Sequence, residues 1–428
     1  MDLLTANDHA GEYPASWYAA TATPAPQRPA ASGAVKTDVC IVGAGFTGLS
    51  AALHLAQRGY SVKVVEAQRV GFGASGRNGG QVGMGHRIDQ DELEDMVGDA
   101  DARRLWDIAV QSVDLVRDLC AKMGETFTPG IIHADHRARF VPHSLAYARM
   151  LNEKYGYDQV RGLERDEMRA MVGSDAYHGG SIDLGSGHIH PLRFALGLAQ
   201  MAEDAGATIH EGCKVISAEN GVVKTDAAEI TADHTLLACN GYLGALNDRV
   251  AARVMPINNF ILATEPMDAA QQAALIANNH AVADSKFVVN YYRFGEDGRL
   301  LFGGSESYGY RFPNNIGAKV RKAMLAIYPG LKDTRIDYAW GGTLAITMNR
   351  MPHFERLAGN MLSCSGYSGH GVALATLAGQ IAAETVAGQA ERFDLMAKVP
   401  TQRFPGGAAL RSPLLALAML WFSLRDRL

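Results

Sequence analysis

Three glycines and one acid near the start of the chain have the spacing of a dinucleotide-binding site. Gly43, Gly45 and Gly48 follow a short apolar run, and Glu66 ends the next apolar run. Glycines in this pattern allow a sharp turn, close approach of the backbone to a pyrophosphate and tight packing of a helix on a strand. A carboxylate at the position of Glu66 accepts hydrogen bonds from ribose hydroxyls. We therefore predict strand, turn, helix, strand and acid in that order, with the phosphates at the helix N-terminus.

Two further glycine-rich stretches carry groups that suit a cofactor site. Residues 71–81 contain five glycines together with Ser75, Arg77 and Asn78. Such a stretch cannot pack a core, and its donors predict a loop that clamps the cofactor. Residues 361–371 again predict a strand and a glycine-rich turn, followed by a long helix. No acid stands in the first turn of that helix, so its positive end is free for an anion.

Size and composition are those of a globular enzyme with two or three domains. The chain has 428 residues, 47% of them hydrophobic, and a net charge of −5. This balance gives no reason to expect nucleic acid or an anionic membrane as a partner. The five cysteines are scattered, so we expect neither a disulfide framework nor a zinc site, and a cytoplasmic location fits. His188 and His190 lack a third ligand nearby, and we predict that they structure a loop or lie next to the substrate rather than bind metal.

Hydrophobic periodicity places further elements around these motifs. Residues 1–34 have the composition of an extended tail, which Tyr13, Trp17 and Tyr18 would pin to the body. Helical patterns lead to a buried strand at the cofactor edge, and a hairpin of alternating aromatic and polar residues then forms a wall of the substrate site. The predicted helices cover 91–122, 146–155 and 191–205, a Gly/His loop covers 185–191, the strand covers 234–239, and the hairpin covers 288–294 and 299–304.

The two ends of the chain predict no membrane span. The N-terminus carries Asp2, Asp8 and Glu12 and lacks the basic and apolar regions of a signal peptide. Residues 414–422 are apolar but fall short of the roughly 20 residues that a spanning helix needs. We expect a C-terminal helix that packs on the body or contacts a membrane surface peripherally.

With these motifs in this order, the chain resembles the D-amino-acid oxidase/glycine oxidase class of FAD-dependent oxidoreductases from about residue 36 to residue 395. The narrower resemblance is to the γ-glutamylputrescine oxidases within that class. The stretches that carry it are 71–81, 187–191, 366–371, 404–407 and 423–427. The last two lie outside the general flavin fold, so they make the narrower resemblance more specific.

The resemblance implies an α/β fold (α+β, with two domains). A Rossmann-like FAD-binding domain and a discontinuous antiparallel-sheet substrate domain would alternate along the chain, between an N-terminal extension and a C-terminal apolar helix or tail. The expected ranges are 1–35 for the extension, 36–88, 160–240 and 334–400 for the FAD-binding domain, 89–159 and 241–333 for the substrate-binding domain, and 401–428 for the tail.

The resemblance also implies which residues hold FAD. The first glycine motif and its acid would bind the ADP half, the backbone of Val215 would meet the adenine, and the two later glycine-rich stretches would line the flavin. The helix dipole after the last stretch would stabilise negative charge on the reduced flavin. The expected cofactor-binding residues are Gly43, Ala44, Gly45, Phe46, Thr47, Gly48, Glu66, Ala67, Gly73, Ala74, Ser75, Arg77, Asn78, Gly79, Gly80, Gln81, Val215, Asn240, Gly366, Tyr367, Gly369, His370, Gly371 and Val372.

The implied reaction oxidises a γ-glutamylated amine to an imine, which water hydrolyses to aldehyde and ammonia while O2 is reduced to hydrogen peroxide. The amine must react as the free base, so the pocket needs an apolar, aromatic wall. The candidates for that wall are Tyr291, Tyr292, Trp340 and Tyr367. Arg293, or as a second choice Arg77, would pair with a substrate carboxylate such as that of a γ-glutamyl group. The residues expected to act in catalysis are His370, Tyr291, Arg293 and Trp340.

Two departures from related enzymes leave alternatives open. Sarcosine-type oxidases attach FAD to a cysteine, but residues 340–346 contain none, so noncovalent FAD is expected. Those oxidases also carry a lysine under the flavin, which is absent from 299–304, so O2 and another electron acceptor both stay open. The alternatives are an amino-acid or sarcosine-type dehydrogenase that passes electrons to a quinone, and a flavoprotein subunit without turnover. The sequence does not define the oligomeric state.

Overall fold

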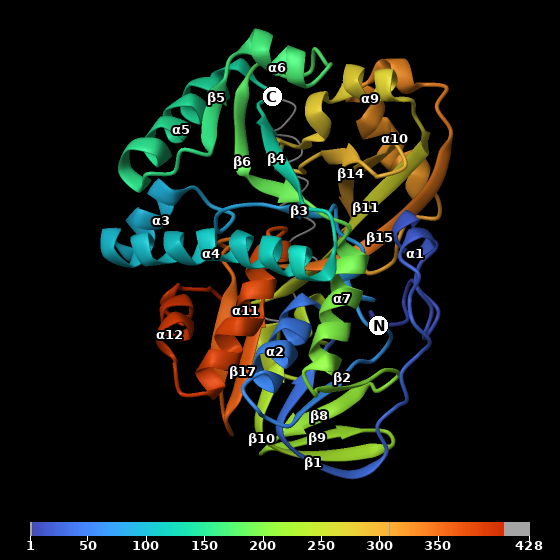
Figure 1. The fold of residues 1–428 in the computed structure, drawn as a ribbon, viewed down its shortest axis with the longest axis vertical. Helices are drawn as coiled ribbons and strands as arrows, with labels where there is room; N and C mark the ends of the chain where they lie inside the picture. Colours follow the sequence, from blue (N-terminus) through green and yellow to red (C-terminus); the bar gives the residue numbers. More distant parts are fainter. Residues whose placement is uncertain (1, 308, 406–428) are drawn as a thin grey trace.

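Two β-sheets and the helices around them make up the protein, which we describe from a computed structural model covering residues 2–307 and 309–405. The first sheet lies in the lower half of Figure 1 and the second in the upper half, while the long helix α4 (Asp99–Met123) crosses between them. This mixed α/β arrangement with two sheets confirms the predicted fold class.

The first sheet contains the predicted nucleotide-binding unit. Among the described residues it has eight strands, and its main path runs β16-β17-β10-β1-β2-β7. Strand β1 pairs in parallel with both β2 and β10, and β10 pairs in parallel with β17, as expected for strands that end at one cofactor edge. The strands are β1 (Gly33–Val42), β2 (Val62–Val65), β7 (Thr208–His210), β8 (Val215–Glu219), β9 (Val222–Thr225), β10 (Ala228–Leu237), β16 (His353–Leu357) and β17 (Met361–Ser365).

The second sheet is mostly antiparallel and has nine strands in the described part of the chain. Its main path runs β15-β11-β14-β13-β12-β4-β6-β3, and β5 pairs with β6. The predicted hairpin is present as the antiparallel pair β13 and β14. The strands are β3 (Gln81–Val82), β4 (Thr128–Ala134), β5 (Val160–Leu163), β6 (Gly180–His188), β11 (Met255–Pro266), β12 (Ala281–Asp284), β13 (Tyr291–Phe294), β14 (Arg299–Ser307) and β15 (Ile336–Ile346).

Helices cover both sheets. Helices α2, α7 and α11 share one hydrophobic core with the strands of the first sheet, and α10 packs on the second sheet. Besides α4, the helices are α1 (Trp17–Thr21), α2 (Phe46–Ala56), α3 (Gln90–Val97), α5 (Val141–Tyr155), α6 (Arg165–Met171), α7 (Pro191–Asp204), α8 (Asp248–Ala251), α9 (Ala269–Leu275), α10 (Ile316–Ile327), α11 (Gly371–Val386) and α12 (Glu391–Lys398).

Several segments belong to a different sheet than the one predicted. Strands β5, β6 and β15 lie in the second sheet, although 160–240 and 334–400 were expected in the FAD-binding domain. Helix α4 shares the core of the first sheet with α11 and α7, although 89–159 was expected in the substrate domain. Residues 185–188, expected in a loop, complete strand β6. Alternating hydrophobicity marks a strand but does not say which sheet it joins, and this explains these differences. The other domain boundaries remain predictions.

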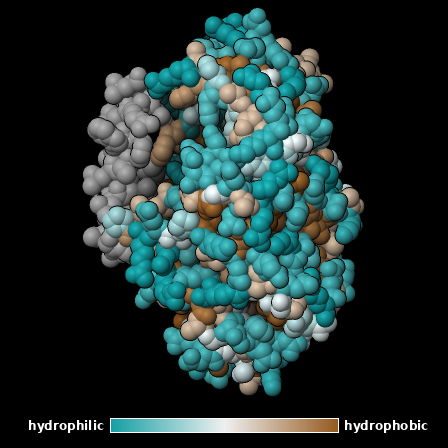
Figure 2. Space-filling model, turned by 90° about the vertical axis from the view of Figure 1, so that its left-hand side faces the viewer, coloured by the Kyte–Doolittle hydropathy of each residue, from teal (hydrophilic) through white to brown (hydrophobic). Residues whose placement is uncertain are grey.

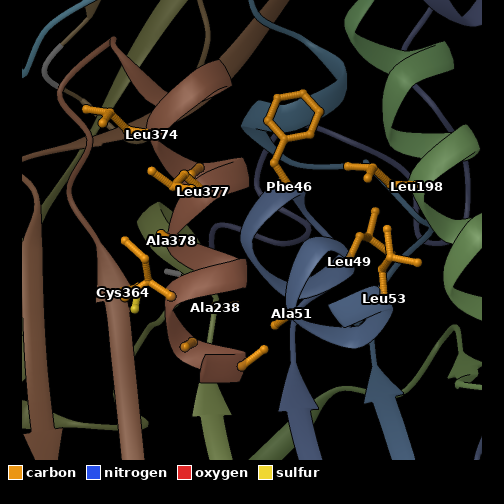
Figure 3. Close-up of a cluster of buried hydrophobic side chains, with 14 of the residues drawn as sticks. Phe46, Leu49, Ala51, Leu53, Leu198, Ala238, Cys364, Leu374, Leu377 and Ala378 are labelled. Atoms are coloured by element: carbon orange, nitrogen blue, oxygen red, sulfur yellow. The ribbon is translucent and has the colours of Figure 1, made fainter. Parts of the chain in front are cut away.

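Helices α2 and α11 pack side by side at unusually short range. A methyl group at Gly379 of α11 would lie 2.3 Å from the carbonyl oxygen of Thr47 and 2.6 Å from the backbone nitrogen of Ala51 on α2. Figure 3 shows Ala51 of α2 and Ala378 of α11 in this core, with Leu198 of α7 on the other side of α2. The small residues set the distance between the two helices, and both helices therefore start next to each other.

The N-terminal extension runs along both halves of the molecule (Figure 1). Trp17 and Tyr18 are buried, and the indole N–H of Trp17 donates to the Asp297 carboxylate at 2.9 Å. The hydroxyl of Tyr13 donates to the carbonyl of Val70 at 2.7 Å. These contacts confirm that the three aromatic residues pin the tail to the body, and they reach both sheets.

The described surface and helices bear on the membrane and metal predictions. On the face drawn in Figure 2 hydrophilic residues predominate, and apolar residues appear mainly as small patches between them. No helix within residues 2–307 and 309–405 is long and apolar enough to cross a membrane. The same residues contain no cluster of three or more potential metal ligands, and their five cysteines form no disulfide. The apolar helix expected within 401–428 falls mostly outside the described residues.

A buried carboxylate fastens the extension to the first sheet. Glu211 has no exposed surface, and its oxygens accept hydrogen bonds from the backbone N–H groups of Arg28 at 2.8 Å and Val70 at 2.6 Å. The guanidinium of Arg69 also donates to it at 3.1 Å. A buried charge that loses its partners is strongly destabilising, so this cluster should matter for folding.

We predict that Glu211→Gln lowers the free energy of unfolding by about 3 kcal/mol, because the substitution breaks a buried ion pair and leaves donors without an acceptor. Urea unfolding followed by circular dichroism measures this loss. The matched control is Glu229→Gln, which removes a solvent-exposed ion pair with Lys224 and should cost less than about 1 kcal/mol. Equal losses in the two variants would contradict the role given to Glu211.

Candidate active site

Two cavities meet between the first sheet and the second. We call the one with more lining residues the larger cavity and the other the smaller cavity. The larger cavity is lined by the starts of α2 and α11, by the 71–81 loop and by strands of the second sheet. The smaller one lies over the ends of β1 and β2 and includes Glu66 and Val215. Both include Gly45, Ser75 and Asn240, so they form one continuous site.

The turn before α2 has the geometry of a phosphate-binding turn. Gly43 has a φ of 107°, and a side chain there would meet the Ala238 carbonyl oxygen at 2.8 Å. A methyl group at Gly48 would lie 1.9 Å from the carbonyl oxygen of Gly43, so only glycine allows this close packing. Gly45 caps the helix without a side-chain hydrogen bond, and the first turn contains no acid. The N-cap residue therefore leaves the first N–H groups of α2 to other acceptors, and Ser75 of the 71–81 loop accepts that of Phe46.

Glu66 stands at the end of β2, next to this turn. Its Oε2 accepts the N–H of Ala44 at 2.8 Å, and its Oε1 accepts the N–H of Gln68 at 2.9 Å. Burial raises the pKa of the Glu66 carboxyl, and the backbone donors act in the opposite direction. In the same cavity, Lys214 and Asp2 of the N-terminal extension form an ion pair at 2.6 Å. The extension therefore contributes to this end of the site, which the sequence did not reveal.

The 71–81 loop is held in shape by its own polar side chains. The amide of Asn78 donates to the carbonyls of Ala74 and Ser75, and its oxygen accepts the N–H of Gly80 at 2.7 Å. The hydroxyl of Ser75 accepts the N–H of Phe46 at 3.0 Å, which ties the loop to the start of α2.

The side chain of Arg77 also stabilises this loop. Its guanidinium pairs with the carboxylate of Asp8 at 2.9 Å and donates to the carbonyl of Phe72 at 2.6 Å. Although Arg77 lines the larger cavity, its charge is thus already paired by the N-terminal extension. Only its Nη2 has no hydrogen-bond partner among the described residues.

The start of α11 forms the opposite side of the larger cavity. His370 caps the helix without a side-chain hydrogen bond to it, and the first turn contains no acid. Its Nε2 lies 2.9 Å from the carbonyl oxygen of Met84, and burial, followed by the nearby Arg87, lowers the pKa of His370 to about 3. The imidazole is therefore neutral at neutral pH. The hydroxyls of Tyr367 and Thr47 lie 2.7 Å apart and connect the starts of α11 and α2.

Most of the predicted cofactor-binding residues line one of the two cavities. Those that do not are Ala44, Gly48, Gly80 and Gly366. Two of them act through the backbone conformation instead. Gly48 provides the close packing described above, and Gly80 has a φ of 76° where a side chain would meet the Ile189 carbonyl oxygen at 2.3 Å.

Of the four residues expected in catalysis, only His370 and Tyr291 line the larger cavity. The position of Arg293 is a correction, because its guanidinium donates to the carbonyls of Gly79, Ile189 and Phe294 and to the hydroxyl of Tyr18. It holds the loop and is not available to a substrate.

Trp340 and Tyr292 also need correction as parts of the cavity wall. The indole of Trp340 donates to the carbonyl of Arg77 at 3.1 Å, behind the loop. Tyr292 stacks on Phe302 in the core of the second sheet. Hydrophobic pattern alone does not distinguish a cavity wall from a core when both are aromatic.

Other residues of the larger cavity were not predicted. The charged or polar ones are Arg87, His133, Asn259, Asp284, Glu306 and Arg350. Arg87 and Arg350 have positive φ angles of 80° and 65°. This backbone conformation is typical of glycine and asparagine, so the residue types at these two positions did not predict it. The sequence indicated a place in the site only for Arg87, because this residue follows the glycine-rich loop. Nothing in the sequence placed Arg350 at the site.

The predicted histidine pair has structural roles. The Nδ1 of His190 accepts the N–H of Arg193 at 3.1 Å and caps α7, and the Nε2 of His188 lies 2.9 Å from the carbonyl oxygen of Asn279. The two imidazoles therefore position the backbone, as predicted.

A family model described as FAD dependent oxidoreductase matches residues 38–385. The chain belongs to this family. The matched range includes both helix starts, the 71–81 loop and the strands between them, and the family implies FAD as the cofactor.

Two relatives align with nearly the whole chain. A probable oxidoreductase, OrdL, from Rhizobium meliloti (strain 1021) is 41% identical over 96% of this chain and 97% of its own. The gamma-glutamylputrescine oxidoreductase of Escherichia coli (strain K12) is 38% identical over 97% of this chain and 99% of its own.

Solved structures share the fold at lower sequence identity. A glycine oxidase from Geobacillus kaustophilus superposes with a TM-score of 0.71 at 20% identity, over 86% of this chain and 99% of that one. An L-proline dehydrogenase from P. horikoshii superposes with a TM-score of 0.70 at 21% identity, over 85% and 97% of the two chains. At this identity the likeness concerns the fold alone.

The residues present fit FAD. Two helices without capping side chains start at the larger cavity, and glycines keep its walls open. A methyl group at Gly79 would lie 2.6 Å from the ring of Tyr291, and one at Gly83 would lie 2.9 Å from the imidazole of His370. No cysteine lines the larger cavity among the described residues.

We predict that Gly48→Ala weakens FAD binding by about tenfold or more, because the added methyl group forces α2 away from the phosphate-binding turn and such overpacking costs about 1–3 kcal/mol. The flavin-to-protein absorbance ratio after dialysis measures the loss. Gly317→Ala on α10 is the control, since its methyl group would meet only ordinary contacts at 3.6 Å and beyond. Full FAD retention by Gly48→Ala would contradict this account.

Proposed function

We propose that this enzyme oxidises the terminal amine of a γ-glutamylated amine such as γ-glutamylputrescine. The products would be an imine, which water hydrolyses to aldehyde and ammonia, and reduced cofactor, which O2 reoxidises with formation of hydrogen peroxide. The observation that carries the proposal is the 38% identity over nearly full length to the gamma-glutamylputrescine oxidoreductase of Escherichia coli. The cavity described above supports it with an aromatic wall and cationic side chains.

FAD, when bound, accepts two electrons from the substrate and passes them to the acceptor. We propose that Glu66 and Val215 bind the adenosine end and that the start of α2 binds the pyrophosphate. The 71–81 loop and the start of α11 would line the flavin. Noncovalent attachment is part of the proposal, because the described lining of the larger cavity offers no thiol.

The chain's own contribution is to present the amine as a free base. Tyr291 and Phe287 line the cavity with aromatic surface, and burial raises the pKa of the Tyr291 hydroxyl, which donates to Asn259. Burial likewise lowers the pKa of His133 in the same cavity. In such a desolvated place the neutral amine is favoured over the ammonium form.

His370 would add a neutral donor or acceptor at the start of α11. Its imidazole bonds to Met84 and stays uncharged, so the positive end of the helix dipole acts on the cofactor without a competing anion nearby on that turn. This arrangement favours negative charge at that end of the flavin, as reduction requires. The cytoplasmic location remains a prediction.

We predict that anaerobic γ-glutamylputrescine bleaches the visible flavin band of the FAD-loaded enzyme. Admission of air should restore the band and produce hydrogen peroxide in equal amount to the aldehyde. Stopped-flow absorbance and a coupled peroxide assay measure both half-reactions. Free putrescine and sarcosine serve as comparison substrates.

The outcomes separate the competing functions. Bleaching without rapid recovery in air, together with fast recovery on a quinone, would contradict the oxidase and favour a dehydrogenase. Absence of bleaching by any γ-glutamylamide, with sarcosine or amino acids active, would overturn the substrate assignment. A flavoprotein that no amine reduces would be a subunit without turnover.

A further inference from the structure

Two arginines line the larger cavity without an ion pair to any carboxylate of the described residues. Arg87 lies between the glycine-rich loop and α3, and Arg350 lies in the turn between β15 and β16. They are far apart in the sequence, and both have the positive φ angles given above, so the fold holds each in a backbone conformation that is rare for arginine.

Arg87 uses only part of its hydrogen-bonding capacity. Its Nε donates to the carbonyl of Ser368 at 3.2 Å, and its terminal nitrogens have no hydrogen bond to any described residue. Burial, followed by the charge of Arg350, lowers the pKa of Arg87 from its usual value. A guanidinium keeps its charge even so, which leaves a half-buried cation that an anion would stabilise.

Arg350 is in a similar situation. Its guanidinium carbon lies 5.5 Å from the ring centroid of Phe287, and it has neither a hydrogen bond from its side chain nor an ion pair within the described chain. The other arginines of the site differ in this respect. Arg77 is paired with Asp8, and Arg293 is bonded to backbone carbonyls.

The cavity also offers a charge of the opposite sign. Glu306 of β14 lines it, and the Glu306 carboxylate raises the pKa of Arg87 against the larger effects of burial and Arg350. Arg87, Arg350 and Glu306 therefore line one volume, whose lining also includes Asp284 and the paired Arg77. The head group of an α-amino acid, with its carboxylate and its ammonium, has the complementary pattern.

We propose that Arg87 and Arg350 form a carboxylate subsite that binds the α-carboxylate of the γ-glutamyl group, with Glu306 nearest to its α-ammonium. This proposal rests on the proposed function and names the residues that select the substrate class. Guanidinium groups suit the task, because each presents planar paired donors to a carboxylate. The subsite replaces the predicted role of Arg293, which does not line the cavity and uses four of its five N–H groups on other residues.

The test is a variant and substrate matrix with FAD-loaded enzyme. The variants are Arg87→Gln, Arg350→Gln and, as a control, Arg356→Gln, which removes a surface ion pair with Asp394. The substrates are γ-glutamylputrescine, glutarylputrescine, which lacks the α-amino group, and 4-aminobutanoylputrescine, which lacks the α-carboxylate.

We predict that Arg350→Gln and Arg87→Gln raise KM for the two carboxylate-bearing substrates by about 10- to 100-fold, as expected for loss of a charged hydrogen bond, with a smaller effect on kcat. Neither variant should change KM for 4-aminobutanoylputrescine by more than about threefold. The control should match the wild type throughout. A flavin spectrum and FAD content like those of the wild type would show that the variants still fold.

Equal losses with all three substrates would overturn the subsite while leaving the proposed function intact. Failure of the wild type to oxidise any of them would instead overturn the proposed function. In that case glutarate is titrated against the flavin spectrum. A spectral shift that is present in the wild type and absent in Arg350→Gln supports the subsite, and identical titrations in both proteins overturn it.

Discussion

The close packing of α2 against α11 is the constraint on which the site depends. Gly379 and Ala51 let the two helices approach until a single methyl group would collide with the backbone. Both helices therefore start at the same cavity, and neither start is capped by the side chain of its own N-cap residue or carries an acid. Two positive helix ends close together would be costly without an anion, and a cofactor with a pyrophosphate and a reducible ring supplies negative charge to both.

The second sheet and the N-terminal extension supply the parts of the site that the first sheet does not provide. The sheet supplies Tyr291, Glu306 and the wall opposite the helix starts, while the turn after β15 supplies Arg350. The extension pairs Asp8 with Arg77 of the 71–81 loop and Asp2 with Lys214 at the smaller cavity. The charge of Arg77 is thereby paired within the protein. We therefore propose other residues for the recognition of a substrate anion.

A larger share of the predicted cofactor-binding residues than of the predicted substrate residues lines the two cavities. Glycine spacing, an acid after an apolar run and a helix without a first-turn acid each have a local physical cause, so they can be recognised without coordinates. The substrate cavity depends on long-range contacts. The carbonyl groups that bind Arg293 belong to other segments of the chain, so the sequence did not show that this guanidinium is occupied. The sequence did not place Arg350 at the cavity, because its position depends on how β15 and β16 are joined. Which sheet β5, β6 and β15 join was hidden for the same reason.

The most direct measurement of the central claim is a crystal structure of the FAD-loaded enzyme. Our account predicts that the pyrophosphate accepts hydrogen bonds from the first N–H groups of α2. The pyrimidine edge of the flavin should lie against the start of α11 at Gly369–Gly371, with its open face toward Tyr291. A flavin whose pyrimidine edge lies away from α11, or a pyrophosphate bound elsewhere than at Gly45 and Phe46, would contradict it.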